Sequence, residues 1–360
     1  MTGEIFVDAK DGLQSSILQI FSRLLESSEL SLDDDFFDKG GDSLLATELM
    51  LELRKLTGKA LPDSLLFESS TVRALAQRLS QKETPRARAT VRIGAASDIA
   101  KPLIFFHGDW THGGFYVEHL ARKLGPEISL IAVAAHGSGG EPIPPTIEAM
   151  AADRLPAILE AQPTGPYRLA GHCVGGIVAL ETARLLMKLN HQVETVVMID
   201  SPVMMGGEAV KNPLFAAGDA GARDPAATPD DIPVRPATPF GPAFEIYTER
   251  LTEYSPTALP VRLFVLASEY DGRDWARLSA DAELIDVPGD HFDLVTRRIG
   301  DLASGLSSWI SGGGPPVRQH ENTGLPPATE DKESSAALAG EASNETLSRR
   351  LGRLFNYGHR

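Results

Sequence analysis

Cysteine is nearly missing from this sequence: Cys173 is the only one, which excludes an internal disulfide and a cysteine-rich metal site. Positive charge is also scarce, with 34 Lys and Arg residues against 49 Asp and Glu residues and a formal net charge of −15. Such a surface repels phosphates, so we expect neither nucleic acid nor an anionic membrane as a partner. No apolar run approaches the roughly 20 residues of a membrane-spanning helix, and the N-terminus lacks the basic and apolar regions of a secretion signal. A reducing cytoplasm fits these absences.

The composition that remains is that of a globular protein. The 360 residues, 42% of them hydrophobic, are enough to bury a sizeable core, and the length predicts two or three domains. Residues 1–80 contain leucines at helical spacing and no strand-like run, which predicts a small helical bundle. Residues 81–98 shift to Arg, Ala and Thr, a composition typical of a mobile linker.

From residue 99 to about residue 312, short apolar runs alternate with longer helical patterns, which predicts an α/β domain. The runs PLIFFHG, SLIAVAA, YRLAGH, TVVMID and VRLFVLAS are too short for buried helices, so we expect a mostly parallel sheet with helices on both faces. Between about residues 203 and 241 the pattern dissolves into Gly, Pro, Ala and Asp, long enough for a lid. Residues 313–360 are too polar to form a core and are expected to be disordered, ending in a short amphipathic helix or a frayed tail.

The stretch Gly171-His172-Cys173-Val174-Gly175 lies between the strand-like run YRLA and a helical pattern. A G-x-S-x-G nucleophile elbow requires this strand–turn–helix context, and here cysteine stands in place of serine. The turn would place Cys173 at a helix N-terminus, where free N–H groups and the helix dipole favour a thiolate. We therefore interpret Cys173 as a nucleophile; the alternative is an inert buried cysteine.

The partners of such a nucleophile follow it in the chain order acid, then histidine. Asp200 ends the run TVVMID, where the chain must leave the sheet, and is the expected acid; its alternative role is a helix cap or turn residue. His291, in the loop VPGDHFDLV, is the expected base, because the histidines after it lie in the polar tail. His172 is interpreted as a packing residue. Three more histidines either line the pocket or are ordinary core or solvated residues: His107, His112 and His136.

Negative charge that develops on an attacked carbonyl needs hydrogen-bond donors. One should be the backbone N–H of Val174, and the other the backbone of Asp109, in the loop after the first long strand. The Gly113-Gly114 pair nearby would let this loop fold close to a substrate, or it is only a turn.

A second motif, FFDKGGDSL, lies in the N-terminal part of the chain at residues 36–44. Its glycine pair bends the chain into the leucine-rich helix and places Ser43 at or beside the N-cap, where a phosphate on the hydroxyl would meet free N–H groups. A serine at this place is often a simple cap. The aromatic pair and the helical domain around it favour a serine that is modified.

On these motifs, residues 1–80 resemble the carrier domains of nonribosomal peptide and polyketide synthases, through FFDKGGDSL and the later LPDSLLFESSTVRALA. The resemblance implies a small all-α four-helix domain, with a 4′-phosphopantetheine attached to Ser43 by a phosphopantetheinyl transferase. Residues 100–310 resemble the type I thioesterase domains that end such assembly lines, through PLIFFHGDWTHGGFY, the elbow, MIDSP and PGDHFDLV. This implies an α/β-hydrolase fold, with Cys173 as nucleophile, Asp200 as orienting acid and His291 as general base. Upstream synthase subunits or other carrier proteins would be the partners.

The departure from that family is the cysteine. With serine, an acyl group leaves a thioester for a more stable oxygen ester, whereas with Cys173 one thioester replaces another and the acyl group stays activated. Transfer to another carrier thiol or to an amine is then as accessible as hydrolysis, and a thiolate is a good nucleophile at neutral pH. Two other functions compete with this one: a carrier protein with a non-catalytic hydrolase-like domain, and a hydrolase of diffusible esters.

Overall fold

The computed structural model describes residues 9–94, 102–108, 113–138, 141–202, 241–268, 271–289, 291 and 293–310. Four of the expectations above lie outside these residues. They are Asp109, His112, all but the last residue of the expected lid (about 203–241), and the tail at residues 313–360 with its C-terminal helix.

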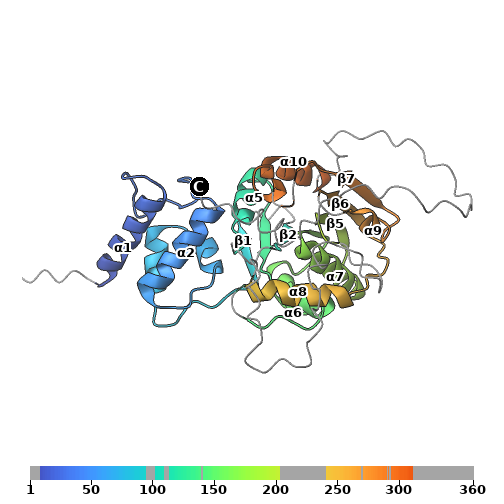
Figure 1. Ribbon diagram of the computed structural model, residues 1–360, viewed down its shortest axis with the longest axis horizontal. Helices are drawn as coiled ribbons and strands as arrows, with labels where there is room; N and C mark the ends of the chain where they lie inside the picture. Colours follow the sequence, from blue (N-terminus) through green and yellow to red (C-terminus); the bar gives the residue numbers. More distant parts are fainter. Residues whose placement is uncertain are drawn as a thin grey trace, which may run out of the picture.

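The N-terminal part of the chain is made of helices (Figure 1). They are α1 (Ala9–Leu24), α2 (Ser43–Thr57), α3 (Ser64–Glu68) and α4 (Val72–Leu79). Their apolar inner faces and aromatic residues from the loop before α2 form one buried cluster. A side-chain cap fixes where α2 begins, because Asp42 accepts a hydrogen bond from the Leu45 N–H (2.9 Å). The helical expectation for this part of the chain is confirmed.

A seven-stranded sheet forms the centre of the C-terminal part. Its strands are β1 (Thr90–Ile93), β2 (Leu103–Phe106), β3 (Leu130–Val133), β4 (Tyr167–His172), β5 (Val193–Ile199), β6 (Arg262–Ala267) and β7 (Ala282–Asp286). Their order across the sheet is β1-β3-β2-β4-β5-β6-β7. Only β1 runs antiparallel to its neighbour, so the expected mostly parallel sheet is confirmed.

Helices cover both faces of this sheet (Figure 1). They are α5 (Tyr116–Leu124), α6 (Ile147–Ala161), α7 (Val174–Lys188), α8 (Gly241–Glu253), α9 (Arg273–Ala276) and α10 (Ile299–Ile310). Successive strand residues enter different cores, with Leu103 and Phe105 packed beside α5 and α10, and Ile104 and Phe106 beside α6 and α7. This alternation within an all-apolar strand is expected where both faces of a sheet are buried.

The expected linker, residues 81–98, requires a correction, because strand β1 lies inside it. Thr90–Ile93 pairs with β3 in the register Thr90↔Val133 and adds an antiparallel edge strand. The physical reason is that Val91 and Ile93 are β-branched and Ile93 is buried against the sheet, whereas the flanking Arg and Ala residues hide this short pattern in the sequence.

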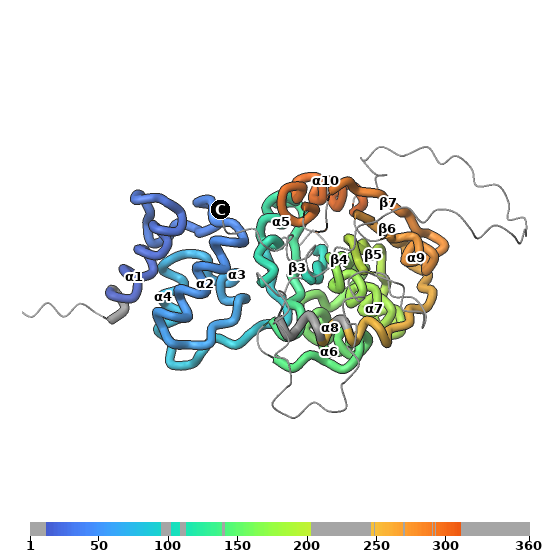
Figure 2. The backbone as a smooth tube through the Cα atoms, in the orientation of Figure 1, coloured from blue at the N-terminus to red at the C-terminus, as the bar shows by residue number. Residues whose placement is uncertain are grey.

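The two parts of the chain pack against each other at the start of α5, close to the β1 edge (Figure 2). Phe115 belongs to the buried cluster of the N-terminal helices, and its ring centroid lies 5.1 Å from that of Phe67. Arg122, in the last turn of α5, pairs with Asp35 (2.9 Å) and with Asp38. Apolar packing and ion pairing therefore hold the helical domain on the edge of the α/β domain.

Candidate active site

Cys173 occupies a sharp turn between β4 and α7, at the N-cap of the helix. Its backbone angles, φ 56° and ψ −133°, lie in a region that L-residues rarely adopt, so the turn is strained. Close packing enforces the turn: a Cβ at Gly171 would lie 2.4 Å from the Gly175 carbonyl, and one at Gly175 would lie 2.2 Å from the Phe106 carbonyl oxygen. The expected strand–turn–helix placement of the cysteine is thus present.

The end of β2 lies directly against this turn. A Cβ at Gly108 would meet the His172 carbonyl oxygen at 2.5 Å and the Cys173 Cβ at 2.8 Å, so only glycine fits there. The N–H of Val174, an expected oxyanion donor, belongs to the first turn of α7, where backbone N–H groups have no intrahelical partner. Gly114 packs its backbone on the His107 ring. Gly108, the last described residue before Asp109, therefore lies against Cys173.

Asp200 and His291 meet at the same carboxyl edge of the sheet. The Nδ1 of His291 lies 2.6 Å from the Asp200 Oδ2, and both side chains are buried, at 6% and 0% exposed. The other carboxylate oxygen of Asp200 accepts a hydrogen bond from the backbone N–H of Ser268 (2.8 Å), which follows β6. Sequence reasoning missed Ser268, because a backbone donor leaves no side-chain signal.

Electrostatics favour a protonated His291. Burial alone would lower the pKa of His291, but the neighbouring Cys173 sulfur and Asp200 carboxylate outweigh it, through charge and hydrogen bonds, and raise the pKa to about 10. The ring is therefore an imidazolium at neutral pH, in contact with the Cys173 sulfur at the start of α7. The structure thus brings together the three residues that the sequence picked out.

His172 has a more specific place than the packing role expected from the sequence. Its Nε2 lies 3.1 Å from the backbone oxygen of His291, and because a carbonyl only accepts, Nε2 carries the proton. The two imidazole centroids are 4.4 Å apart, and the Tyr116 ring meets His172 edge to face at 5.8 Å. Sequence reasoning dismissed this histidine because a strand residue beside a nucleophile points away from it.

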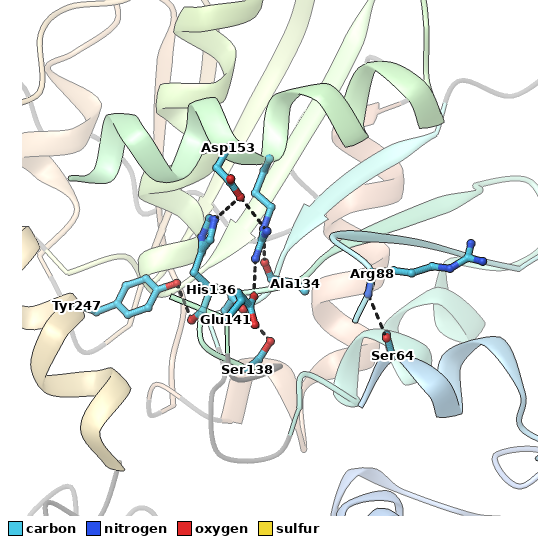
Figure 3. Close-up of polar contacts among 10 residues, drawn as sticks. Ser64, Arg88, Ala134, His136, Ser138, Glu141, Asp153 and Tyr247 are labelled. Carbon is cyan, nitrogen blue, oxygen red and sulfur yellow. Dashed lines mark hydrogen bonds and ion pairs between the residues drawn. The ribbon is translucent and has the colours of Figure 1, made fainter. Parts of the chain in front are cut away.

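A cavity of about 600 Å³ lies between the helical domain, β1 and the α/β domain, and His107 and His136 line it. Around His136, polar side chains form a network (Figure 3). The Arg154 guanidinium contacts Glu141 (2.8 Å) and Asp153 (3.0 Å), and Asp153 also contacts the His136 Nε2 (2.9 Å). Burial and the Arg154 charge lower the pKa of His136, so its ring is neutral at neutral pH. His112 lies outside the described residues.

Ser43 is the first residue of α2 and follows the cap Asp42. It is half-buried, and its neighbour Leu44 is 55% exposed, so this end of the helix faces solvent. A phosphate on the Ser43 hydroxyl would meet the free N–H groups and the positive end of a 15-residue helix. The local geometry therefore fits a phosphate-linked group.

Two classes of site find no support in the described part of the chain. No group of three or more His, Cys, Asp or Glu side chains there is arranged to hold a metal ion. None of the helices described has both the length and the apolar character needed to cross a membrane.

Family models match both parts of the chain. The model of a phosphopantetheine attachment site matches residues 15–79, and that of a thioesterase domain matches residues 101–213. A phosphopantetheine attachment domain implies a covalent 4′-phosphopantetheine on a serine.

Similar proteins are large synthases. Indigoidine synthase of Streptomyces lavendulae is 34% identical over 197 residues, which are 54% of this chain and 15% of that protein. Erythronolide synthase EryA3 of Saccharopolyspora erythraea is 28% identical over 338 residues, 78% of this chain and 10% of that protein. The chain thus spans a small part of the length of these relatives.

A solved structure that matches most of the chain supports the fold. It is a four-domain nonribosomal peptide synthetase bound to AMP and glycine. The match covers 88% of this chain and 27% of the synthetase chain, with a TM-score of 0.52 and 21% sequence identity. Together with the topology above, this establishes helices at the N-terminal end followed by an α/β-hydrolase-like domain with a mostly parallel sheet.

Proposed function

Because the chain combines a phosphopantetheine attachment domain with a thioesterase domain of nonribosomal peptide and polyketide synthesis, we propose that it releases or transfers an acyl, aminoacyl or peptidyl group held as a thioester. Cys173 is the nucleophile, His291 the general base and Asp200 the orienting acid. The single observation that carries this proposal is the contact of a strained, helix-capping cysteine with a buried imidazole that lies 2.6 Å from a carboxylate.

The N-terminal domain supplies the carrier in this proposal. Ser43 is the attachment serine, since it opens α2 in the matched region and faces solvent beside Leu44. When attached, the 4′-phosphopantetheine supplies a thiol on which cargo rides as a thioester. A phosphopantetheinyl transferase and other synthase domains or carrier proteins are the partners.

The residues of the site divide the reaction between them. The Cys173 thiolate attacks the thioester carbonyl, and the Val174 N–H at the helix start stabilises the negative charge on the oxygen. The protonated His291 then gives its Nε2 proton to the departing thiolate, which leaves a thioester on Cys173. Asp200 holds Nδ1 throughout, so that Nε2 faces the reacting atoms. For deacylation, His291 takes a proton from the acceptor as the acceptor attacks the carbonyl, and the carbon–sulfur bond to Cys173 then breaks, which restores the Cys173 thiolate and the protonated His291.

The choice of sulfur affects the second half of the reaction. The acyl group on Cys173 is again a thioester, so the first step is close to balanced in free energy and the acyl group remains activated. We propose that an acceptor thiol or amine competes with water for it. The 600 Å³ cavity beside His107 offers room for an acceptor next to the loop that adjoins Cys173.

The test uses the full chain with an acyl group loaded on its carrier domain. Intact mass spectrometry follows unloading in the wild type, in Cys173→Ala and in Cys173→Ser. We expect Cys173→Ala to lose at least about 10³-fold in rate, since subtilisin loses about 2 × 10⁶-fold when its nucleophile is removed. Unloading by Cys173→Ala at the wild-type rate would favour a carrier with a non-catalytic hydrolase-like domain.

A second arm separates the possible outcomes of unloading. The loaded wild type is mixed with a second carrier protein or with simple amines, and the products are weighed. Transfer products should appear with the wild type and fall relative to free acid with Cys173→Ser, which forms the more stable oxygen ester. Free acid alone from both proteins would count against transfer, and faster turnover of small diffusible esters would favour a general ester hydrolase.

A further inference from the structure

The turn at Phe115 and Tyr116 contacts both domains. Phe115 is 1% exposed and packs within the buried cluster of the carrier domain, with ring centroids 5.1 Å from Phe67 and 6.5 Å from Phe37. The next residue, Tyr116, points into the thioesterase core, where its ring meets His172 edge to face at 5.8 Å. Adjacent residues at the start of α5 are thus packed in two different cores.

His172 contacts both Tyr116 and His291, the proposed base. It donates a hydrogen bond from Nε2 to the backbone oxygen of His291 (3.1 Å), and the two rings are 4.4 Å apart and tilted by 31°. This bond holds the backbone from which the His291 side chain reaches Asp200. Loss of the bond would free the loop at the point where the base must be placed.

The far end of α5 is tied to the same carrier domain. Arg122 pairs with Asp35 at 2.9 Å and with Asp38, and it also contacts Glu118 one turn earlier on its own helix at 3.1 Å. Asp38 lies in the FFDKGGDSL loop that leads into α2 and Ser43. When the carrier domain is docked, it therefore contacts α5 at both ends of the helix.

We propose that docking of the carrier domain positions the general base, through the Phe115–Tyr116 turn and with His172 as the positioning residue. The inference rests on the proposed role of His291 as that base. With the carrier docked, Tyr116 supports His172 and the thiolate–imidazolium pair is held. With the carrier away at a partner, α5 loses the contacts at both of its ends, and Cys173 becomes less reactive when no cargo is present. The proposal requires two discrete arrangements of the domains, docked and undocked, of which the structure shows the docked one.

The single cysteine allows a test without turnover. In a Ser43→Ala background, which carries no prosthetic thiol, iodoacetamide alkylates Cys173 alone, and the rate is measured from pH 5 to 10, a range of about five units around the ordinary thiol pKa. We expect Arg122→Glu, and separately Phe115→Ala, to slow alkylation at neutral pH by about 3- to 30-fold and to shift the profile toward that of an ordinary thiol. Arg277→Glu, which breaks an exposed ion pair with Asp274 on α9, is the control and should match the parent.

His172→Phe keeps a ring beside Tyr116 but removes the donor, so it should give the same shift, and His172→Gln, which restores an N–H donor, should recover part of it. Combining Arg122→Glu with His172→Phe should cost no more than the larger single effect, because both act through one contact. Effects that multiply, or wild-type alkylation in variants that X-ray scattering shows to be undocked, would overturn the coupling. An ordinary thiol profile in the parent that His291→Gln leaves unchanged would instead refute the proposed pair itself.

Discussion

The strained turn at Cys173 leaves no room for side chains nearby. Gly108 lies against this turn, since a Cβ there would meet the Cys173 Cβ at 2.8 Å. Even one methyl group at Gly108 must therefore move Cys173, the end of β2, or both.

We expect Gly108→Ala to lower kcat by about 10²-fold, the loss that a misplacement of about 1 Å produces in an active site. The rate at which the acyl-loaded chain is unloaded measures this loss. Gly300→Ala on α10, where nothing lies within 4 Å of the added Cβ, is the control and should keep full activity. Equal activity in both variants would show that the approach of β2 to the thiol is looser than described.

The protonated His291 also affects folding stability. Its pKa rises from 6.5 to about 10 on folding, so the folded state binds this proton more tightly than the unfolded state. The resulting stabilisation is fully present below about pH 6.5 and is lost as the pH rises through about 10.

We therefore expect the difference in unfolding free energy between the wild type and His291→Gln to shrink steadily from pH 6.5 to pH 10. Urea denaturation at a series of pH values measures it. His119→Gln, an exposed position on α5, is the control, and its difference from the wild type should stay constant. A difference that is flat for His291→Gln would mean that the ring is not held as an imidazolium.

The residues of the site were predictable to different degrees. Cys173, Asp200 and His291 follow strands or turns with local sequence signals, so chain order and strand ends were enough to select them. The contacts of His172 and Ser268 were not predictable, because they depend on which loops the folded sheet brings side by side.

Among the elements, the strands of the parallel sheet were predictable because each is a short run of apolar residues bounded by polar ones. The edge strand β1 was missed: only its antiparallel register with β3 distinguishes Thr90–Ile93 from the surrounding linker. The helix α8 was not predicted either, because its residues directly follow a Gly- and Pro-rich segment.

The chain leaving α8 is fixed to α7 by a buried polar contact. Burial and the Glu181 carboxylate raise the pKa of Tyr254, so its hydroxyl stays protonated and donates to Glu181 Oε1 at 2.6 Å. Arg184 bonds the same carboxylate at 3.2 Å and also the backbone oxygen of Thr257 at 2.5 Å. The contact thus joins two elements that the sheet alone does not hold together.

Tyr254→Phe should lower the unfolding free energy by about 1.5–3 kcal/mol, since it removes a hydrogen bond to a buried charged group. Urea denaturation followed by circular dichroism measures the change. Tyr167→Phe is the matched comparison: its hydroxyl donates to a neutral acceptor, the Gln162 backbone oxygen (2.7 Å), and should cost only about 0.5–1.5 kcal/mol. An equal loss in both variants would indicate that the Glu181 charge adds nothing.

Across the whole molecule, the docked arrangement combines an apolar contact at Phe115 with opposite charges at Arg122 and Asp38. Asp38 is 65% exposed, so its pairing should weaken with salt, whereas the aromatic contact should not.

We expect Arg122→Glu to separate the domains, because it places a further carboxylate against Asp35 and Asp38, and Arg122→Lys to keep them docked, because it retains the positive charge. Small-angle X-ray scattering measures the outcome: the radius of gyration should rise in Arg122→Glu and stay at the wild-type value in Arg122→Lys. A radius that is unchanged in Arg122→Glu would mean that the contact of Phe115 is enough to hold the domains together.

The pairing of β1 with β3 also decides how far the carrier domain can travel. Because Thr90 is paired at the sheet edge, the segment that connects α4 to the sheet consists of residues 80–89. These residues span at most about 35 Å when fully extended. A domain confined within that radius has an effective concentration in the millimolar range at its own hydrolase. If the chain acts as we propose, cargo on any other carrier would have to compete with cargo on this one, so the length of the connecting segment would help to select the substrate.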